Sequence, residues 1–234
     1  MNIVILSVDE QKEKITPNEK LLKSTALLLG HSARIIHNFH VQFFFNKEGP
    51  HLLYKGKAFP KADIILVRPY RLRNLELEVS TIKQMELLGY PIFNNYTGIL
   101  HAKNKLRTLQ ILHNSGIPIP KTFVVHSLNY LNETIKKIKH FPVLLKAPYG
   151  SYGTGVVILE SIRSFRSALE WISTEFQNKI LVIQEYVKEA KGKDIRVFVV
   201  GKKVVAAMER RAKKGEFRSN FERGGSVHLT DLSD

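Results

Sequence analysis

The sequence predicts an α/β protein, because apolar strand-like runs alternate with helical patterns along most of its 234 residues. Ile3–Val8 and Ala62–Val67 are predicted as buried strands, and Asn18–Leu29 has the spacing of an amphipathic helix that ends at Gly30. A hydrophobic content of 44% can support a substantial core. This alternation favours a small layered domain whose strands are mainly parallel.

The rest of the first hundred residues continues the pattern. Leu75–Leu88 is predicted as a helix ended by Gly89, and a short strand follows from Pro91. His51–Phe59, with Lys55-Gly56-Lys57 at its centre, is predicted as an inserted hairpin.

A single helix from Gly98 to Ser115, stopped by Gly116 and a Pro-rich break, is predicted to lead into a second module. That module comprises strand Thr122–Val125, helix Ser127–His140, strands Val143–Ala147 and Val156–Leu159, and a helix from Ile162 to Phe176. A third segment is predicted to hold a strand within Lys179–Val187 and a hairpin of Ile195–Val200 with Val204–Met208. We therefore expect three α/β segments, 1–95, 96–178 and 179–234.

Composition and simple motifs exclude several classes of protein. The chain has no cysteine, which excludes a disulfide scaffold and thiolate chemistry. No run approaches 18 apolar residues, and the first residues resemble a strand more than a signal peptide, so we expect a cytoplasmic protein without a membrane span. No His/Asp/Glu spacing matches a zinc site, and the Gly-x-Ser-x-Gly nucleophile motif is absent.

The chain is strongly basic, with a formal net charge of +15. The excess is concentrated between Lys188 and Arg223, where 12 basic side chains face 5 acidic ones. A field of this kind favours polyanions such as nucleotide phosphates, acidic peptides or RNA. A basic, well-solvated surface is the alternative, and it suits the scattered lysines of the first half better.

The most informative motif is Leu-Lys-Ala-Pro-Tyr-Gly-Ser-Tyr-Gly-Thr-Gly at residues 145–155. The order of its glycines matches neither the P-loop nor the dinucleotide-binding fingerprint. Lys146 instead ends an apolar strand and precedes a glycine loop that a second strand follows, which makes a flap able to cover phosphates. A buried lysine at this point favours a bound anion over a solvated strand end. The glycines of the loop are Gly150, Gly153 and Gly155.

The strand that ends in Gln184-Glu-Tyr-Val could bind an adenine along its edge. Glu185 would accept a hydrogen bond from the exocyclic amine, and Val187 would offer its N–H to a ring nitrogen. Asp194 is spaced to reach a ribose hydroxyl. Taken alone, an ordinary strand with one exposed glutamate and a turn aspartate explains these residues as well.

The densest polar segment is 209–225, which is predicted as a loop or frayed ribbon. Its arginines could clamp carboxylates or phosphates, and Ser219 and Asn220 add neutral donors. A basic solvated loop that contacts RNA is the alternative, and the choice of arginine over lysine favours anion recognition. The arginines in question are Arg210, Arg211, Arg218 and Arg223.

Together these motifs resemble the ATP-grasp superfamily, and more specifically the RimK-type amino-acid ligases. The resemblance spans the whole chain. It implies an α/β ATP-grasp fold with an N-terminal Rossmann-like pre-ATP-grasp domain (1–95), a central subdomain carrying the glycine-rich flap (96–178) and an incomplete C-terminal subdomain (179–234). Its most specific motifs are Tyr54-Lys-Gly-Lys, Gln84-Met-Glu-Leu-Leu-Gly, Asn104-Lys-Leu-Arg, and the segment from Gln184 through Arg218-Ser-Asn.

The resemblance also implies a role for each matching residue. Lys105 and Lys146 would contact ATP phosphates, and the loop from Gly150 through Gly153 to Gly155 would close over the nucleotide. Glu185, Tyr186 and Val187 would hold the adenine, and Asp194 would hold the ribose. The phosphate and substrate end would be bound by Arg218, Ser219 and Asn220. These last three would also be the catalytic residues.

The reaction implied by the resemblance is an ADP-forming ligation. A substrate carboxylate becomes an acyl phosphate, and an amino group then attacks it to give an amide. The expected substrates are ATP, an acidic amino acid such as glutamate, and a protein or peptide acceptor, for which a small-subunit ribosomal protein is one candidate. A second copy of the chain, in a homo-oligomer, is a further expected partner.

Magnesium is expected as a cofactor through the resemblance alone. RimK-type enzymes continue past the position of Asp234, and their last strands supply the acidic and Asn ligands for Mg²⁺, so no metal ligand is predicted in this chain. Three alternatives stay open: a sibling ligase acting on a small cofactor or amino-acid carrier, a truncated ATP-binding module without catalysis, and a basic RNA-binding protein.

Overall fold

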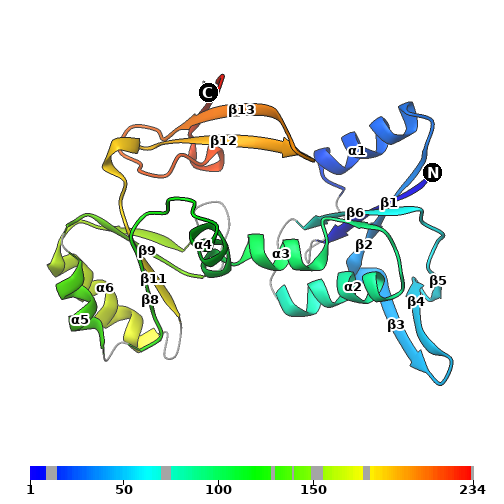
Figure 1. Cartoon of the computed structure of the whole chain (residues 1–234), viewed down its shortest axis with the longest axis horizontal. Coiled ribbons are helices and arrows are strands. Elements are labelled where there is room, and N and C mark those ends of the chain that lie inside the picture. The colour runs from blue at the N-terminus through cyan, green and yellow to red at the C-terminus, as the bar shows by residue number, and fades with distance from the viewer. Residues whose placement is uncertain are drawn as a thin grey trace. The chain divides into compact units, whose positions relative to one another are not determined.

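The computed structural model describes residues 1–8, 15–69, 75–127, 130–138, 140–148, 155–175 and 180–232. Contacts divide the chain into two compact units, Met1–Arg107 (unit 1) and Thr108–Asp234 (unit 2). Helices and several sheets occur in both, which confirms the predicted α/β class (Figure 1). The finer division at residues 95 and 178 stays a prediction. No helix in the described part of the chain has the length and apolar character needed to span a membrane.

Unit 1 is built on a parallel sheet with the strand order β2-β1-β6-β7, as the alternation of elements predicted. A separate antiparallel sheet, β3-β4-β5, confirms the expected hairpin and adds β3, which the sequence did not suggest. The elements are β1 (Asn2–Val8), α1 (Pro17–Leu28), β2 (Ser32–His37), η1 (Asn38–His40), β3 (Val41–Asn46), β4 (Gly49–Tyr54), β5 (Lys57–Ala58), β6 (Ile64–Pro69), α2 (Leu75–Leu87), β7 (Ile92–Phe93) and α3 (Tyr96–Lys103).

Helices cover both faces of the parallel sheet (Figure 1). On one face Ile3 and Ile5 of β1 pack with Ala26 of α1. On the other face Val4 and Leu6 belong to a larger core that includes Val79, Ile82 and Met85 of α2. Because both faces are buried, β1 is apolar along nearly its whole length.

The prediction of one continuous helix from Gly98 to Ser115 is wrong. The structure has two helices here, α3 and α4 (Lys105–Asn114), which are separated at Asn104. Asn104 has an extended backbone, with φ −109° and ψ 113°. Its Oδ1 accepts hydrogen bonds from the N–H groups of Leu106 (2.9 Å) and Arg107 (3.2 Å). An asparagine that caps the free N–H groups of a helix start ends one helix and begins the next.

Unit 2 contains two antiparallel sheets, with the strand orders β10-β9-β11-β8 and β12-β13-β14. The predicted β12–β13 hairpin is confirmed, although β13 continues to Arg211 and β14 was not foreseen. After α4, the elements are β8 (Thr122–Val125), α5 (Leu131–Lys137), β9 (Val143–Lys146), β10 (Val156–Leu159), α6 (Ile162–Glu175), β11 (Leu181–Glu185), η3 (Lys188–Ala190), β12 (Lys193–Val200), β13 (Lys203–Arg211), η4 (Phe221–Arg223) and β14 (Ser226–Leu229).

The first sheet of unit 2 has one core face and one polar face. Leu145 and Ile183 pack with Phe165 and Leu169 of α6, which lies against this side of the sheet together with α5 (Figure 1). The register places Lys146 opposite Val182, and Gln184 opposite both Leu144 and Thr122. Residues paired across strands share a face, so Lys146, Gln184 and Thr122 all lie on the side away from α6.

We predict that Phe165→Ala destabilises unit 2 by about 3–5 kcal/mol, because it removes a fully buried ring from the core under the polar face. Urea unfolding followed by fluorescence or circular dichroism measures the effect. Trp171→Ala is the matched control on the same helix. Because Trp171 is 60% exposed, this substitution should cost at most about 1 kcal/mol. Equal losses in the two variants would contradict the assignment of the core face.

Candidate nucleotide site in unit 2

A cavity of about 300 Å³ lies over the polar face of the first sheet of unit 2. Its lining comes from five parts of the chain. They are the residue Pro120 before β8, β9, the start of β10, the segment from the end of β11 to the start of β12, and the loop before η4. Eight of the predicted site residues are brought together here: Lys146, Glu185, Tyr186, Val187, Asp194, Arg218, Ser219 and Asn220.

The other predicted site residues are placed differently. Gly155 lies beside the cavity, where its carbonyl accepts a hydrogen bond from the Ala147 N–H at 3.0 Å. Gly150 and Gly153 lie outside the described residues. Lys105 begins α4 and belongs to unit 1, and burial lowers its pKa from the usual value of 10.5. Its contact with phosphate therefore stays a prediction.

Lys146 is held by a relay of hydrogen bonds across three strands. Its Nζ donates to Gln184 Oε1 at 2.5 Å, and Gln184 Nε2 donates to Thr122 Oγ1 at 2.9 Å. The Thr122 hydroxyl donates in turn to the Pro120 carbonyl at 2.7 Å. The relay places a cation on the cavity wall with few free rotamers, which suits it to contact an anion.

Sequence reasoning missed the part played by Gln184. The signal was a buried amide within the otherwise apolar strand Leu181–Gln184. Buried polar side chains need hydrogen-bond partners, so a glutamine in such a strand indicates a polar neighbour on the adjoining strand. The register that puts Lys146 two residues along β9 from Leu144, the residue opposite Gln184, and on the same face was available only from the fold.

The chain leaves β11 along the cavity in an extended conformation. Glu185 N–H donates to Lys121 O at 2.9 Å, and the Val187 carbonyl accepts from Ala190 N–H at 3.2 Å. Among the described residues, no backbone acceptor is found for the Val187 N–H. Val187 lines the cavity together with the apolar residues Leu144 and Val156.

Asp194, on β12, joins this strand to β13 and to the loop that contains Ser219. Its carboxylate accepts from Arg210 Nε at 2.7 Å and Arg210 Nη2 at 2.6 Å, and Ser219 Oγ donates to the same group. Burial acts to raise its pKa, but the hydrogen bonds from Arg210 and Ser219 outweigh burial and hold the pKa of Asp194 below its usual range. Asp194 is therefore an ionised anchor for Ser219, and its predicted bond to a ribose stays a prediction.

Arg218 and Glu216 form a second ion pair in the same loop. Arg218 Nη2 donates to Glu216 Oε2 at 2.8 Å, and Arg218 Nε donates to Oε1 at 3.0 Å. The Arg218 side-chain hydrogen bond is the largest cause that lowers the pKa of Glu216 to about 2; burial opposes it, and the N–H groups of Phe217 and Arg218 add to it. The guanidinium also lies over the Phe217 ring, 5.0 Å from its centroid. The pair fixes the side chain of Arg218 at the edge of the cavity.

The polar segment 209–225 is thus more ordered than the predicted frayed ribbon. The structure gives three of its arginines partners within the chain: Arg210 binds Asp194, Arg211 binds Glu209, and Arg218 binds Glu216. Sequence reasoning identified arginines able to clamp carboxylates but assigned them to a ligand. The internal partners were hidden because pairs such as Arg210 and Asp194 meet only when β12 and β13 are aligned.

Gly225 allows the loop to approach β13 closely. A Cβ at this buried position would lie 2.7 Å from Ser219 O and 2.8 Å from Arg211 O. Both atoms belong to the backbone, so neither can move without shifting the loop. Gly225 is therefore needed to hold Ser219 and Asn220 where they line the cavity.

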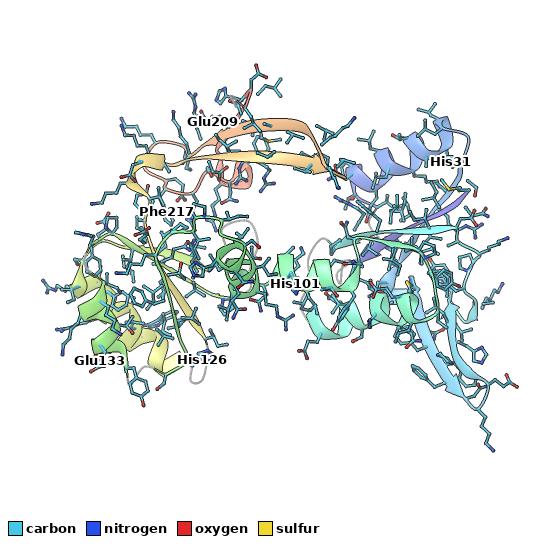
Figure 2. All side chains as sticks on the ribbon, in the orientation of Figure 1. His31, His101, His126, Glu133, Glu209 and Phe217 are labelled. Atoms are coloured by element: carbon cyan, nitrogen blue, oxygen red, sulfur yellow. The ribbon has the colours of Figure 1, made fainter. Side chains whose placement is uncertain are left out.

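The cavity combines charge with apolar walls. Lys146, Lys193 and Arg218 supply positive charge, and Glu185 and Asp194 supply negative charge. Phe217 contributes an aromatic wall and lies between the β12–β13 hairpin and the sheet that contains β9 (Figure 2). A flat apolar base near Val187 and a phosphate chain near Lys146 would match this distribution. In the described parts of the chain, no group of three or more His, Cys, Asp or Glu side chains could hold a metal ion.

Comparison with known proteins gives a consistent match. A family model described as RimK-like ATP-grasp domain matches residues 102–234. A "Probable alpha-L-glutamate ligase" of Vibrio vulnificus (strain YJ016) is 35% identical over 233 residues, covering 100% of this chain and 75% of the relative. A "Ribosomal protein bS6--L-glutamate ligase" of Escherichia fergusonii is 35% identical over 237 residues, covering 100% and 76%.

The fold has a counterpart among solved structures. The crystal structure of a RimK domain protein ATP-grasp from Sphaerobacter thermophilus aligns with a TM-score of 0.68 at 17% identity, covering 92% of this chain and 76% of that chain. At this level of identity the likeness concerns the fold alone, and it confirms the predicted architecture.

We predict that Gly225→Ala lowers affinity for an ATP analogue about tenfold, because the new methyl group must displace the Ser219–Asn220 loop. It should also cost about 1–3 kcal/mol of stability. Calorimetric titration and thermal unfolding measure the two effects. Gly201→Ala, at the hairpin tip with open space around it, is the control and should leave affinity unchanged. Normal binding by Gly225→Ala would refute the close-approach argument.

We also predict that the Glu216 carboxyl titrates near pH 2 in the folded chain. Because its pKa is lowered from 4.5, the ion pair with Arg218 should stabilise the loop fully above pH 4.5 and lose this effect as the pH falls toward 2. Carboxyl-carbon NMR measures the midpoint. Glu216→Gln should flatten the pH dependence of stability in this window relative to the native chain. A Glu216 midpoint near 4.5 would disprove the pairing.

Proposed function

The chain belongs to the RimK-like ATP-grasp family, and on this basis we propose that it is an ATP-dependent, ADP-forming ligase that joins an acidic amino acid to a carboxylate. The observation that carries the proposal is that one cavity in unit 2 gathers eight predicted nucleotide-site residues. Relatives with 35% identity along the whole chain bear the name of glutamate ligases, which supports glutamate as the amino acid.

ATP is proposed to lie with its adenine against the end of β11. The Val187 N–H and the Glu185 backbone or side chain would meet the base, and Leu144, Val156 and Phe217 would form its apolar surroundings. The volume of about 300 Å³ is at the lower end of the range for small-molecule sites. Lys146, fixed by Gln184, would then contact the phosphates.

The proposed reaction balances in two steps. A carboxylate oxygen attacks the γ-phosphorus of ATP, and the bond to the β-phosphate oxygen breaks to release ADP. The amino group then attacks the acyl carbon, phosphate leaves, and the nitrogen loses a proton to give an amide. Lys146 and Arg218 would neutralise charge on the phosphoryl group, and Ser219 and Asn220 would position it, so most of the catalysis would come from orientation and electrostatics.

The finer parts of the proposal rest on the family. The acceptor is proposed to be the C-terminal carboxylate of a protein or peptide, since one relative is named for ribosomal protein bS6. Mg²⁺ is proposed to accompany ATP. A cytoplasmic location and a homo-oligomer also stay proposals.

We predict that Lys146→Ala weakens binding of a non-hydrolysable ATP analogue about tenfold or more, because a charge-assisted contact to phosphate is lost. Adenosine, which lacks phosphates, should bind both proteins equally well. Isothermal titration calorimetry with and without Mg²⁺ measures these affinities, with the exposed Lys203→Ala as control. Unchanged affinity for the analogue in Lys146→Ala would remove Lys146 from the site.

Ligation itself is tested by release of ADP in the presence of glutamate and an acceptor peptide, with mass spectrometry of the peptide. An increase in peptide mass by one or more glutamate residues, dependent on ATP, supports the proposed function. ADP release with a small amine or carboxylate in place of the peptide would indicate a sibling ligase instead. Nucleotide binding without any product would indicate a non-catalytic ATP-binding module.

A further inference from the structure

The threonine at the start of β8 is connected to the nucleotide cavity without lining it. Thr122 is not among the described residues around the cavity, whereas Pro120, Lys146 and Gln184 are. Its hydroxyl makes two hydrogen bonds to that lining: it donates to the Pro120 carbonyl at 2.7 Å and accepts from Gln184 Nε2 at 2.9 Å. Thr122 therefore acts on the cavity wall through two of the residues that form it.

The direction of these hydrogen bonds is fixed at the Pro120 end. A carbonyl oxygen can only accept, so the single hydroxyl proton of Thr122 is committed to Pro120. Toward Gln184 the Thr122 oxygen can then only accept, which requires an N–H group on that side. The amide nitrogen of Gln184 therefore faces Thr122, and the amide oxygen is left to face the neighbouring strand β9.

The Gln184 oxygen meets the ammonium group of Lys146. Lys146 Nζ donates to Gln184 Oε1 at 2.5 Å. An ammonium group has donors only, so the reversed amide would set N–H groups against each other and displace the cation. Gln184 is 8% exposed, and in so buried a side chain a lost partner is not readily replaced by water. The orientation set by Thr122 thus decides whether this side chain attracts or repels the ammonium group.

The start of β8 also holds the opposite end of the same wall. Thr122 lies opposite Gln184 in the register of β8 and β11. The carbonyl of the preceding residue, Lys121, accepts the Glu185 N–H at 2.9 Å. Glu185 lines the cavity at the proposed adenine end, and Lys146 lines it at the proposed phosphate end. Two consecutive residues therefore hold both ends of the wall in one register.

We propose that Thr122 is a positioning residue of the nucleotide site, which orients the Gln184 amide and so holds the Lys146 ammonium group where the ATP phosphates bind. The inference rests on the proposed function, because it requires Lys146 to contact phosphate. Thr122 acts through Gln184 alone, so its contribution disappears when there is no amide to orient.

The test is isothermal titration calorimetry of the 234-residue chain with a non-hydrolysable ATP analogue and with adenosine. Thr122→Val removes the hydroxyl at nearly constant shape. We expect it to weaken binding of the analogue about fivefold and to leave adenosine binding unchanged, because only the phosphate end is affected. Thr122→Ser keeps the hydroxyl and should bind the analogue as the native chain does.

Thr134→Val is the matched control. The Thr134 hydroxyl also donates to a backbone carbonyl, that of Tyr130 at 3.1 Å, but it lies on α5 and is not part of the described cavity lining. This variant should bind the analogue with native affinity. A loss in Thr134→Val as large as that in Thr122→Val would overturn the proposal.

A double-mutant cycle with Gln184→Leu separates positioning from a general effect on the sheet. Gln184→Leu should weaken binding of the analogue by a factor similar to that of Thr122→Val. Adding Thr122→Val to Gln184→Leu should cause no further loss, because the amide that Thr122 orients is gone. Losses that multiply in the double variant would show that Thr122 acts by another route and would overturn the proposal.

Thermal unfolding of every variant shows which of them fold. If Thr122→Val does not fold, NMR of the native chain carries the test, with the Gln184 side-chain amide signals assigned by their absence in Gln184→Leu. The amide protons should show stronger nuclear Overhauser contacts to the Thr122 side chain than to the ε-methylene group of Lys146. The reverse pattern would overturn the proposal.

The same measurements keep the positioning role distinct from the proposed function. If the native chain does not bind the analogue, the proposed function fails, and the NMR contacts of the Gln184 amide still report whether Thr122 orients it. If the native chain binds the analogue and folded Thr122→Val binds it equally tightly, or loses adenosine by the same factor, the nucleotide site stands and the positioning role fails.

Discussion

The carboxylate of Asp194 is the interaction on which the nucleotide cavity depends most. It accepts hydrogen bonds from Arg210 on the neighbouring strand and from Ser219 in the loop that follows β13. One ionised group therefore joins β12, β13 and the loop that supplies Ser219, Asn220 and Arg218 to the cavity. Gly225 completes this arrangement by letting the loop backbone lie against β13 without a side chain between them. The polar wall of the cavity is thus built by pairs within the protein, and a ligand would meet side chains that are already oriented.

The opposite wall follows from the two faces of the β10-β9-β11-β8 sheet. Its core face packs on α6 through Phe165 and Leu169, which fixes the strand positions. Its other face then presents Lys146, held through Gln184 and Thr122 to the Pro120 carbonyl. Because strand residues alternate between faces, the same register that buries Leu145 places Lys146 toward the cavity. Core packing and the position of the charged group are consequences of one register.

Much of this could be predicted from sequence, for physical reasons that differ by region. The parallel sheet of unit 1 was predictable because β1 is apolar on both faces, and Lys146 was predictable because a lysine that ends a buried strand needs an anion or a polar partner.

The break at Asn104 was missed because its capping hydrogen bonds are local and interrupt an otherwise helical pattern. The partners of Arg210 and Lys146 were missed because they depend on strand register between distant segments, which periodicity does not specify.

The proposed function requires the cavity of unit 2 to bind ATP through the end of β11 and the Arg218–Asn220 loop. Hydrogen–deuterium exchange of the 234-residue chain, with and without a non-hydrolysable ATP analogue, tests it most directly because it reports on individual backbone segments. We expect slower exchange on binding in residues 185–187 and 216–220, with little change in the β3–β4 hairpin of unit 1. An analogue that binds without slowing exchange in either of these unit 2 segments would contradict the account.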